Sequence, residues 1–73
     1  MLDNQKELIE LANTKMPYGK YKDKLLIHIP EYYMVWLKNK GFPKGKLGNQ
    51  LQLIYEIKLN GLESLILPLI HRS

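Results

Sequence analysis

The chain has 73 residues, a formal net charge of +4, two histidines and no cysteine, so we expect one domain over residues 1–73, with one small core and no metal or cofactor. Its longest apolar stretch is far shorter than the ~20 residues that span a bilayer, and its N-terminus lacks the features of a signal peptide. These observations exclude a disulfide scaffold and a membrane-spanning protein, and they predict a cytoplasmic protein.

The N-terminal segment predicts an amphipathic helix from about Asn4 to Asn13. Its apolar residues recur at helical spacing, and its charged residues occupy the opposite face. Asn4 followed three residues later by Glu7 has the form of a capping box, and Asp3 is the competing cap.

A short β-hairpin is predicted next. Pro17 restricts the residue before it to extended geometry, which favours a strand over residues 16–18. Residues 19–23 carry turn-forming side chains, and the β-prone residues 25–29 provide the returning strand. A lone hairpin is marginally stable in water, so we expect this one to pack on the helices.

Two further helices are each predicted to end at a glycine. Pro30 is well placed as the first residue of the second helix, which ends at Gly41. The third helix runs from about Leu47 to Asn60 and ends before Gly61. A glycine one residue past a helix end favours the Schellman cap, which includes an apolar contact across the end. The expected contact pairs are Phe42 with Leu37 and Leu62 with Ile57.

The third helix is apolar around most of its circumference, which predicts that it is the buried central element of the core. The last segment is expected to form one more turn before Pro68 and to cover the core. The predicted fold class is therefore α+β: a small, mainly helical domain with three main helices and one two-stranded β-hairpin between the first and the second.

Positive charge is concentrated in the middle of the chain. Residues 15–46 carry eight lysines against two acids, whereas residues 1–14 have a net charge of −2 and residues 47–73 are balanced. Such a basic segment is typical of proteins that bind a polyanion. The alternative is that the lysines serve solubility. Since every basic residue except Arg72 is lysine, a nucleic-acid site here would bind backbone rather than read bases.

The first candidate site is the predicted hairpin. In a strand, the alternation of Lys20, Lys22 and Lys24 would place them on one face, with Tyr18 beside them and Tyr21 on the opposite face. Lysines combined with aromatic rings suit phosphate contacts with base stacking. The alternative is that both tyrosines pack on the helices.

The second candidate site is the start of the third helix. Lys44 and Lys46 lie there, Gly45 is the only plausible cap, and the free backbone N–H groups favour an anion. The alternative is a glycine-containing loop with solvated lysines. Together the two candidates give one predicted nucleic-acid-binding set: Tyr18, Lys20, Tyr21, Lys22, Lys24, Lys40, Lys44 and Lys46.

Two further residues have competing interpretations. Lys58 falls within the apolar arc of the third helix, and we expect its ammonium to pair with Asp23 or Glu31 and tie the hairpin to the core. Trp36, the one tryptophan, is expected in the core, with an exposed stacking surface as the alternative.

Nothing in the sequence supports catalysis. There is no cysteine nucleophile, no Walker-type phosphate loop, and the acids of the first helix lie on its predicted solvent face. We expect the protein not to be an enzyme.

Several uncommon spacings occur together in "MPYGKYKDK", "IPEYYMVW", "GFPKGKLG" and "YEIKLNGL". Over residues 16–69 the chain resembles a small bacterial family of unknown function labelled "putative quorum-sensing-regulated virulence factor". It departs from the family pattern at Tyr18, where the pattern has phenylalanine, and at Asp23, where the pattern has a turn glycine. The hairpin and following helix are also similar to a module at the C-termini of some DnaQ-like exonucleases, where that module is presumed to help hold DNA.

Two functional hypotheses follow. The first is a non-enzymatic accessory module that binds DNA or RNA backbone without sequence specificity. The second is a protein-interaction or homodimerisation module that uses the apolar face of residues 62–70.

Overall fold

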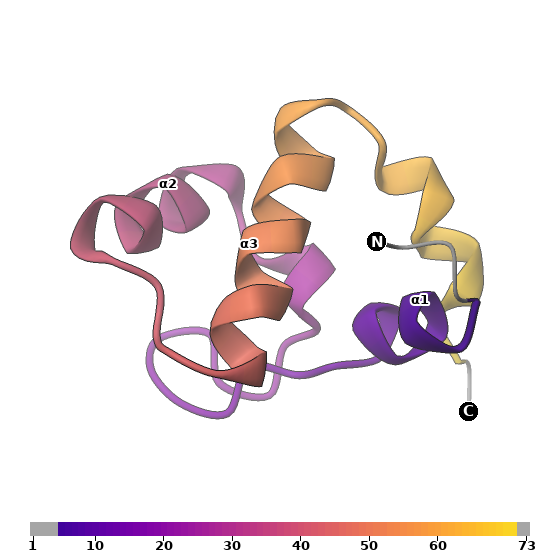
Figure 1. The fold of residues 1–73 in the computed structure, drawn as a ribbon, viewed down its shortest axis with the longest axis horizontal. Coiled ribbons are helices and arrows are strands. Elements are labelled where there is room, and N and C mark those ends of the chain that lie inside the picture. The colour runs from indigo at the N-terminus through magenta and orange to yellow at the C-terminus, as the bar shows by residue number, and fades with distance from the viewer. Residues whose placement is uncertain (1–4, 72–73) are drawn as a thin grey trace.

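The structure is a computed structural model that describes residues 5–71. Three α-helices form most of it: α1 (Gln5–Ala12), α2 (Glu31–Lys40) and α3 (Lys46–Leu59). Figure 1 shows α3 at the centre, with α1 and α2 on opposite sides of it. All three predicted helices are confirmed to within one residue at each end, whereas the proposed caps Asp3 and Asn4 lie outside the described residues.

The hydrophobic core surrounds α3. Leu51, Ile54 and Ile57 of that helix are buried, which confirms its predicted central role. The other elements each contribute a few residues to the same cluster. The buried apolar residues outside α3 are Leu11, Ala12, Met16, Leu26, Ile27, Ile29, Met34 and Ile66.

The predicted β-hairpin is absent, and the α+β assignment was wrong. Within residues 5–71 the chain forms no strand, only an isolated antiparallel bridge between Lys15 and Leu25. Met16 exchanges backbone hydrogen bonds with Asp23 and Lys24 at 2.8 Å, but Pro17 follows and cannot donate to a longer ladder. The pairing therefore does not extend beyond this bridge, and the predicted first strand does not form.

The expected second strand is a turn of 3₁₀ helix, η1 (Leu26–His28). Leu26, Ile27 and Ile29 are all buried. A strand with one face on the core alternates buried and exposed side chains, so two consecutive buried residues do not fit it. A tight turn directs these neighbouring side chains into the same small core.

The two glycine-terminated helix ends differ. At the end of α3, Gly61 has φ 65°, its N–H bonds to the Lys58 carbonyl, and the Leu62 N–H bonds to the Ile57 carbonyl at 2.9 Å. This is the predicted Schellman geometry. At the end of α2, Gly41 has φ 98° and ψ 118°, outside the left-handed helical region, and among the described residues only the inner of the two bonds forms.

The C-terminal segment packs beside α1 (Figure 1). It contains two 3₁₀ turns, η2 (Glu63–Leu65) and η3 (Leu67–Leu69), rather than the single turn expected before Pro68. Asn13 holds it in place: its side-chain amide donates to the Leu69 carbonyl at 3.0 Å, and its oxygen accepts the His71 N–H at 2.7 Å. One polar side chain thus joins the end of α1 to the segment that follows η2.

Gly48 lies in the first turns of α3, where the chain approaching the helix leaves no room for a side chain. A Cβ added at Gly48 would overlap the Pro43 carbonyl oxygen and crowd its carbonyl carbon. The segment between α2 and α3 is therefore pressed directly against the α3 backbone. Only glycine permits this approach.

Gly48→Ala tests that close approach, because two effects have opposite signs. Helix propensity alone favours alanine by about 1 kcal/mol, whereas overpacking against a backbone group costs about 1–3 kcal/mol or more. Because the added methyl group would overlap a backbone oxygen, the cost should be at the upper end of that range, and we expect a net loss of about 2 kcal/mol in urea unfolding followed by circular dichroism. Asn49→Ala, an exposed neighbour, is the control and should change stability by less than about 0.5 kcal/mol. A stabilised Gly48→Ala protein would contradict the packing described.

Candidate nucleic-acid interface

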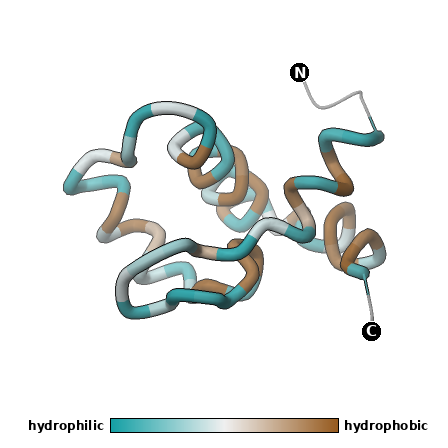
Figure 2. Tube along the Cα trace, turned by 90° about the horizontal axis from the view of Figure 1, so that it is seen from below, coloured by the Kyte–Doolittle hydropathy of each residue, from teal (hydrophilic) through white to brown (hydrophobic). Residues whose placement is uncertain are grey.

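The loop of residues 17–24 carries Lys20, Lys22 and Lys24, all exposed. It closes in two successive turns, with the Lys22 N–H bonded to the Gly19 carbonyl and the Lys24 N–H bonded to the Tyr21 carbonyl. Figure 2 shows this loop as a mostly hydrophilic stretch. Because the loop is not a strand, the strand alternation from which one face was predicted for the three lysines is absent. All three lie within two successive turns of one short loop.

Asp23 explains one departure from the family pattern. Its φ is 70°, a left-handed conformation that glycine adopts freely and that aspartate tolerates better than most residues. Asp23 therefore adopts, at this position of the turn, the backbone conformation that glycine would adopt. Lys58, however, forms no ion pair with Asp23 or Glu31 in the described part of the chain, so that prediction was wrong.

Tyr21 anchors the loop to α2. Its ring meets Tyr33 edge-on at 4.7 Å between centroids, and its hydroxyl shares a 2.7 Å hydrogen bond with the Tyr32 hydroxyl. This agrees with the alternative that the loop tyrosines pack on the helices, but only for Tyr21. Tyr18 is 49% exposed.

Trp36 is 49% exposed, so its expected place in the core was wrong. The buried side of α2 is occupied by Met34, and Trp36 stacks on Tyr33 at 5.2 Å between ring centroids. Tyr21, Tyr32, Tyr33 and Trp36 thus form a continuous set, here called the aromatic cluster. It joins the 17–24 loop to α2.

Lysines flank the aromatic cluster at both ends. The Lys20 ammonium lies 5.7 Å from the centre of the Tyr21 ring, and the Lys40 ammonium lies 4.8 Å from the centre of the Trp36 ring. Both distances allow a cation–π attraction. The structure therefore brings Lys20, Tyr21 and Lys40 of the predicted set into one region, together with rings that were not in that set.

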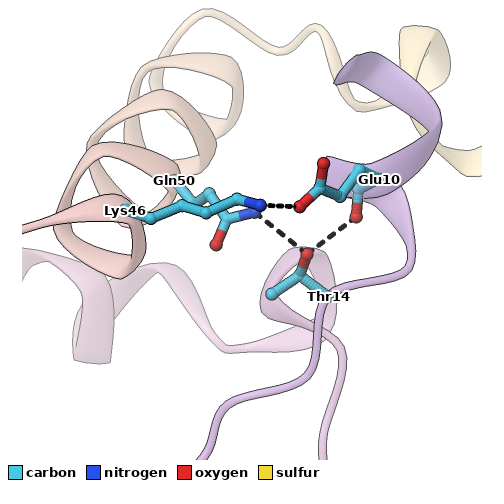
Figure 3. A network of polar contacts seen from close by, with 4 residues as sticks. All are labelled: Glu10, Thr14, Lys46 and Gln50. Carbon is cyan, nitrogen blue, oxygen red and sulfur yellow. Dashed lines mark hydrogen bonds and ion pairs between the residues drawn. The ribbon is translucent and has the colours of Figure 1, made fainter. Parts of the chain in front are cut away.

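The start of α3 is less favourable for an anion than expected. Gly45 is the N-cap, as predicted, with φ 87°. Lys46, however, forms an ion pair with Glu10 of α1, and Figure 3 shows the two side chains pointing toward each other. Beside them the Gln50 amide donates to the Thr14 hydroxyl at 3.1 Å, which in turn donates to the Glu10 carbonyl. This network ties α1 to α3 and partly neutralises Lys46.

A cleft of about 330 Å³ lies between α1 and α3, next to this network. Two carboxylates and one lysine border it, so its charge does not favour a polyanion. Its lining residues are Glu7, Glu10, Leu11, Lys46, Asn49, Gln50 and Leu53. Lys44 lies apart from this cleft, exposed in the segment that connects α2 to α3.

The nucleic-acid-binding set predicted from the sequence does not include Tyr32 and Tyr33. The available signal is the spacing within α2: Met34 and Leu37 lie on one side of a helix, whereas Tyr32 and Trp36, four residues apart, lie together on another. Once Met34 is assigned to the core, the second pair must face away from it. Tyr32 is indeed 65% exposed.

The fold and this region define a small helical module in which exposed lysines flank a cluster of aromatic rings. The chain belongs to the family described as "Putative quorum-sensing-regulated virulence factor", whose model matches residues 4–69. This confirms the resemblance noted in the sequence, although the description specifies no mechanism.

Curated relatives of the chain come from two Escherichia coli strains. The chain is 50% identical over 66 residues to "Uncharacterized protein YpeB" of strain K12, covering 89% of this chain and 92% of that protein. The protein of the same title from strain O157:H7 matches equally well. No solved structure matches the chain significantly. Within residues 5–71, no helix has the length and apolarity needed to cross a membrane.

The Tyr21–Tyr32 hydrogen bond gives the aromatic cluster a measurable pH dependence. This bond first, and burial second, raise the pKa of Tyr21 above its ordinary value. Since the pKa is higher in the folded state, the contribution of the bond to stability is complete below the pKa of an unfolded tyrosine. It is lost as the pH rises through the folded value.

We expect Tyr32→Phe to lower the pKa of Tyr21 toward its ordinary value, measured by NMR titration with ¹³C-labelled tyrosine. Tyr55→Phe is the matched control, because the Tyr55 ring packs against Phe42 instead. An unchanged Tyr21 titration in Tyr32→Phe would show that the two hydroxyls do not interact in solution.

Proposed function

We propose that the protein is a non-enzymatic accessory module that binds nucleic-acid backbone without sequence specificity. The observation that supports this proposal best is the placement of exposed lysines on the 17–24 loop and at the end of α2, on either side of the aromatic cluster. Lysine supplies a mobile point charge for phosphate, without the fixed geometry that reads base edges.

The charge balance of the described residues favours the same region. Within residues 5–71, Lys46 is the one predicted site lysine that forms an ion pair. Lys20, Lys22, Lys24, Lys40 and Lys44 are exposed without a carboxylate partner there. The similarity of this loop and helix to a module of some DnaQ-like exonucleases agrees with the proposal by analogy only.

Salt dependence tests the proposal. If about four phosphates are neutralised, the log–log slope of affinity against salt for a single strand should be about −3. Replacing Lys20, Lys22 and Lys24 by glutamine should reduce its magnitude by about 2, since each phosphate contact contributes about 0.7. Fluorescence anisotropy with labelled single-stranded DNA, duplex DNA and RNA provides the measurement.

A matched pair of single substitutions sharpens this experiment. Lys22→Gln removes an unpaired charge, whereas Lys46→Gln removes one that Glu10 already partly neutralises. We expect Lys22→Gln to weaken binding more than Lys46→Gln. Absence of measurable binding to all three nucleic acids at low salt would refute the proposed function.

A second function is favoured by a different observation. Leu59, Leu62, Leu65 and Leu67 are all exposed, on the end of α3 and the segment that follows it. Several exposed apolar side chains within one short stretch of chain favour a protein–protein contact. We propose that this surface, distinct from the aromatic cluster, mediates homodimer formation.

Analytical ultracentrifugation over a concentration series tests the dimer. Leu65→Glu should shift the equilibrium toward monomer with little change in monomer stability, because Leu65 is 60% exposed. Ser64→Glu, an exposed neighbour, adds the same charge beside the surface and should have the smaller effect. A wild-type protein that stays monomeric at high concentration would rule out the homodimer.

A further inference from the structure

Tyr32 and Trp36 present two aromatic rings to solvent, one helical turn apart on α2. They are 65% and 49% exposed, in a protein whose core is filled by other residues. Single exposed apolar residues need no explanation, but two large rings at i and i+4 form one surface. The core therefore does not account for their type or their position.

Both side chains contact other tyrosines of the aromatic cluster. Tyr33 stacks on Trp36 with an interplanar angle of 28°, and the Tyr21 hydroxyl is hydrogen-bonded to the Tyr32 hydroxyl. Tyr21 also packs edge-on against Tyr33. This bracing fixes the exposed rings before any ligand arrives, so little side-chain entropy remains to be lost on binding.

The charges around the rings favour a polyanion. Lys40 lies 4.8 Å from the Trp36 ring centre, Lys20 lies against Tyr21, and Glu31 is the one carboxylate on α2. An anionic ligand that also carries flat apolar groups fits such a surface. Single-stranded nucleic acid has both features, whereas a duplex keeps its base faces stacked inside and offers only backbone.

We propose that Tyr32 and Trp36 are a base-stacking surface, so that the protein prefers single-stranded nucleic acid to duplex. This inference rests on the proposed nucleic-acid binding and specifies its ligand. Bases stack on the two rings, while Lys20 and Lys40 contact the phosphates on either side. Lys40 is exposed, so its ammonium can turn from the indole toward a phosphate when a base takes its place.

The single tryptophan makes the contact directly observable. Stacking of a base on Trp36 should quench the intrinsic tryptophan fluorescence. We expect quenching by a 12-nucleotide oligothymidine, and none by an abasic strand with the same number of phosphates, although that strand still binds through the lysines. A duplex with the same number of phosphates should bind without quenching. Equal quenching by the abasic strand would overturn the inference.

Substitutions separate this inference from the function on which it rests. Tyr32→Ala keeps Trp36 as the fluorescent reporter. It should weaken oligothymidine binding about 5- to 150-fold, which is the range for one lost base stack. Binding of the abasic strand should not change. Trp36→Ala should weaken oligothymidine binding by a similar factor, measured by fluorescence anisotropy of the labelled strand. Val35→Ala is the control, because Val35 is exposed on the same helix. Circular dichroism verifies that each variant is folded.

The outcomes are distinct. If the Lys20/Lys22/Lys24 variant loses binding while both aromatic variants bind oligothymidine as tightly as the wild type, the protein binds backbone and the stacking inference is wrong. If no probe binds the wild type, the proposed function itself fails.

Discussion

The contact on which the arrangement of helices depends is that between the Pro43 carbonyl and the backbone of Gly48. The segment from α2 to α3 has only five residues, 41–45, and it joins two helices that pack against each other. It does so by lying directly on the first turns of α3, where a methyl group would not fit. This contact holds the start of α3 against the segment that leaves α2, and Met34 is the residue of α2 that faces the core.

The rotation of α2 explains the candidate site. With Met34 buried against the core, Tyr32 and Trp36 point away from it, and Tyr33 lies between the two sides. The 17–24 loop then meets α2 through the Tyr21–Tyr33 contact. The burial of Met34 thus leaves the rings of Tyr32 and Trp36 on the exposed side of α2, next to the 17–24 loop.

Much of this fold could be predicted from the sequence because helices are encoded locally. Apolar spacing and terminal glycines located α1, α2 and α3, and the glycine geometry at Gly61 followed from a well-defined cap. The prediction of a hairpin was wrong because β-prone residues do not specify a strand unless a second strand pairs with them. Residues 25–29 bury neighbouring side chains in a small core, which a turn of 3₁₀ helix permits and a strand does not.

The candidate site was only partly predictable, for a related reason. Lysines can be counted in a sequence, and their concentration over residues 15–46 was visible. The partner of each lysine depends on tertiary packing: Lys46 meets Glu10 across two helices that are separated by 33 residues of chain. Trp36 was misplaced because a lone tryptophan is usually assigned to the core, whereas here the core has room for only one face of α2.

A core of this size leaves some apolar side chains on the surface. These side chains form two surfaces of different chemistry, one of leucines and one of aromatic rings. The leucines at 59, 62, 65 and 67 are aliphatic, and Glu63 is the one charged residue between them, so they suit a protein surface of the same kind. The rings of α2 are flanked by lysines and braced by hydroxyl and ring contacts. An aliphatic partner would leave those ammonium groups without compensation, whereas a single-stranded polyanion whose bases stack on the rings would satisfy both the charges and the rings.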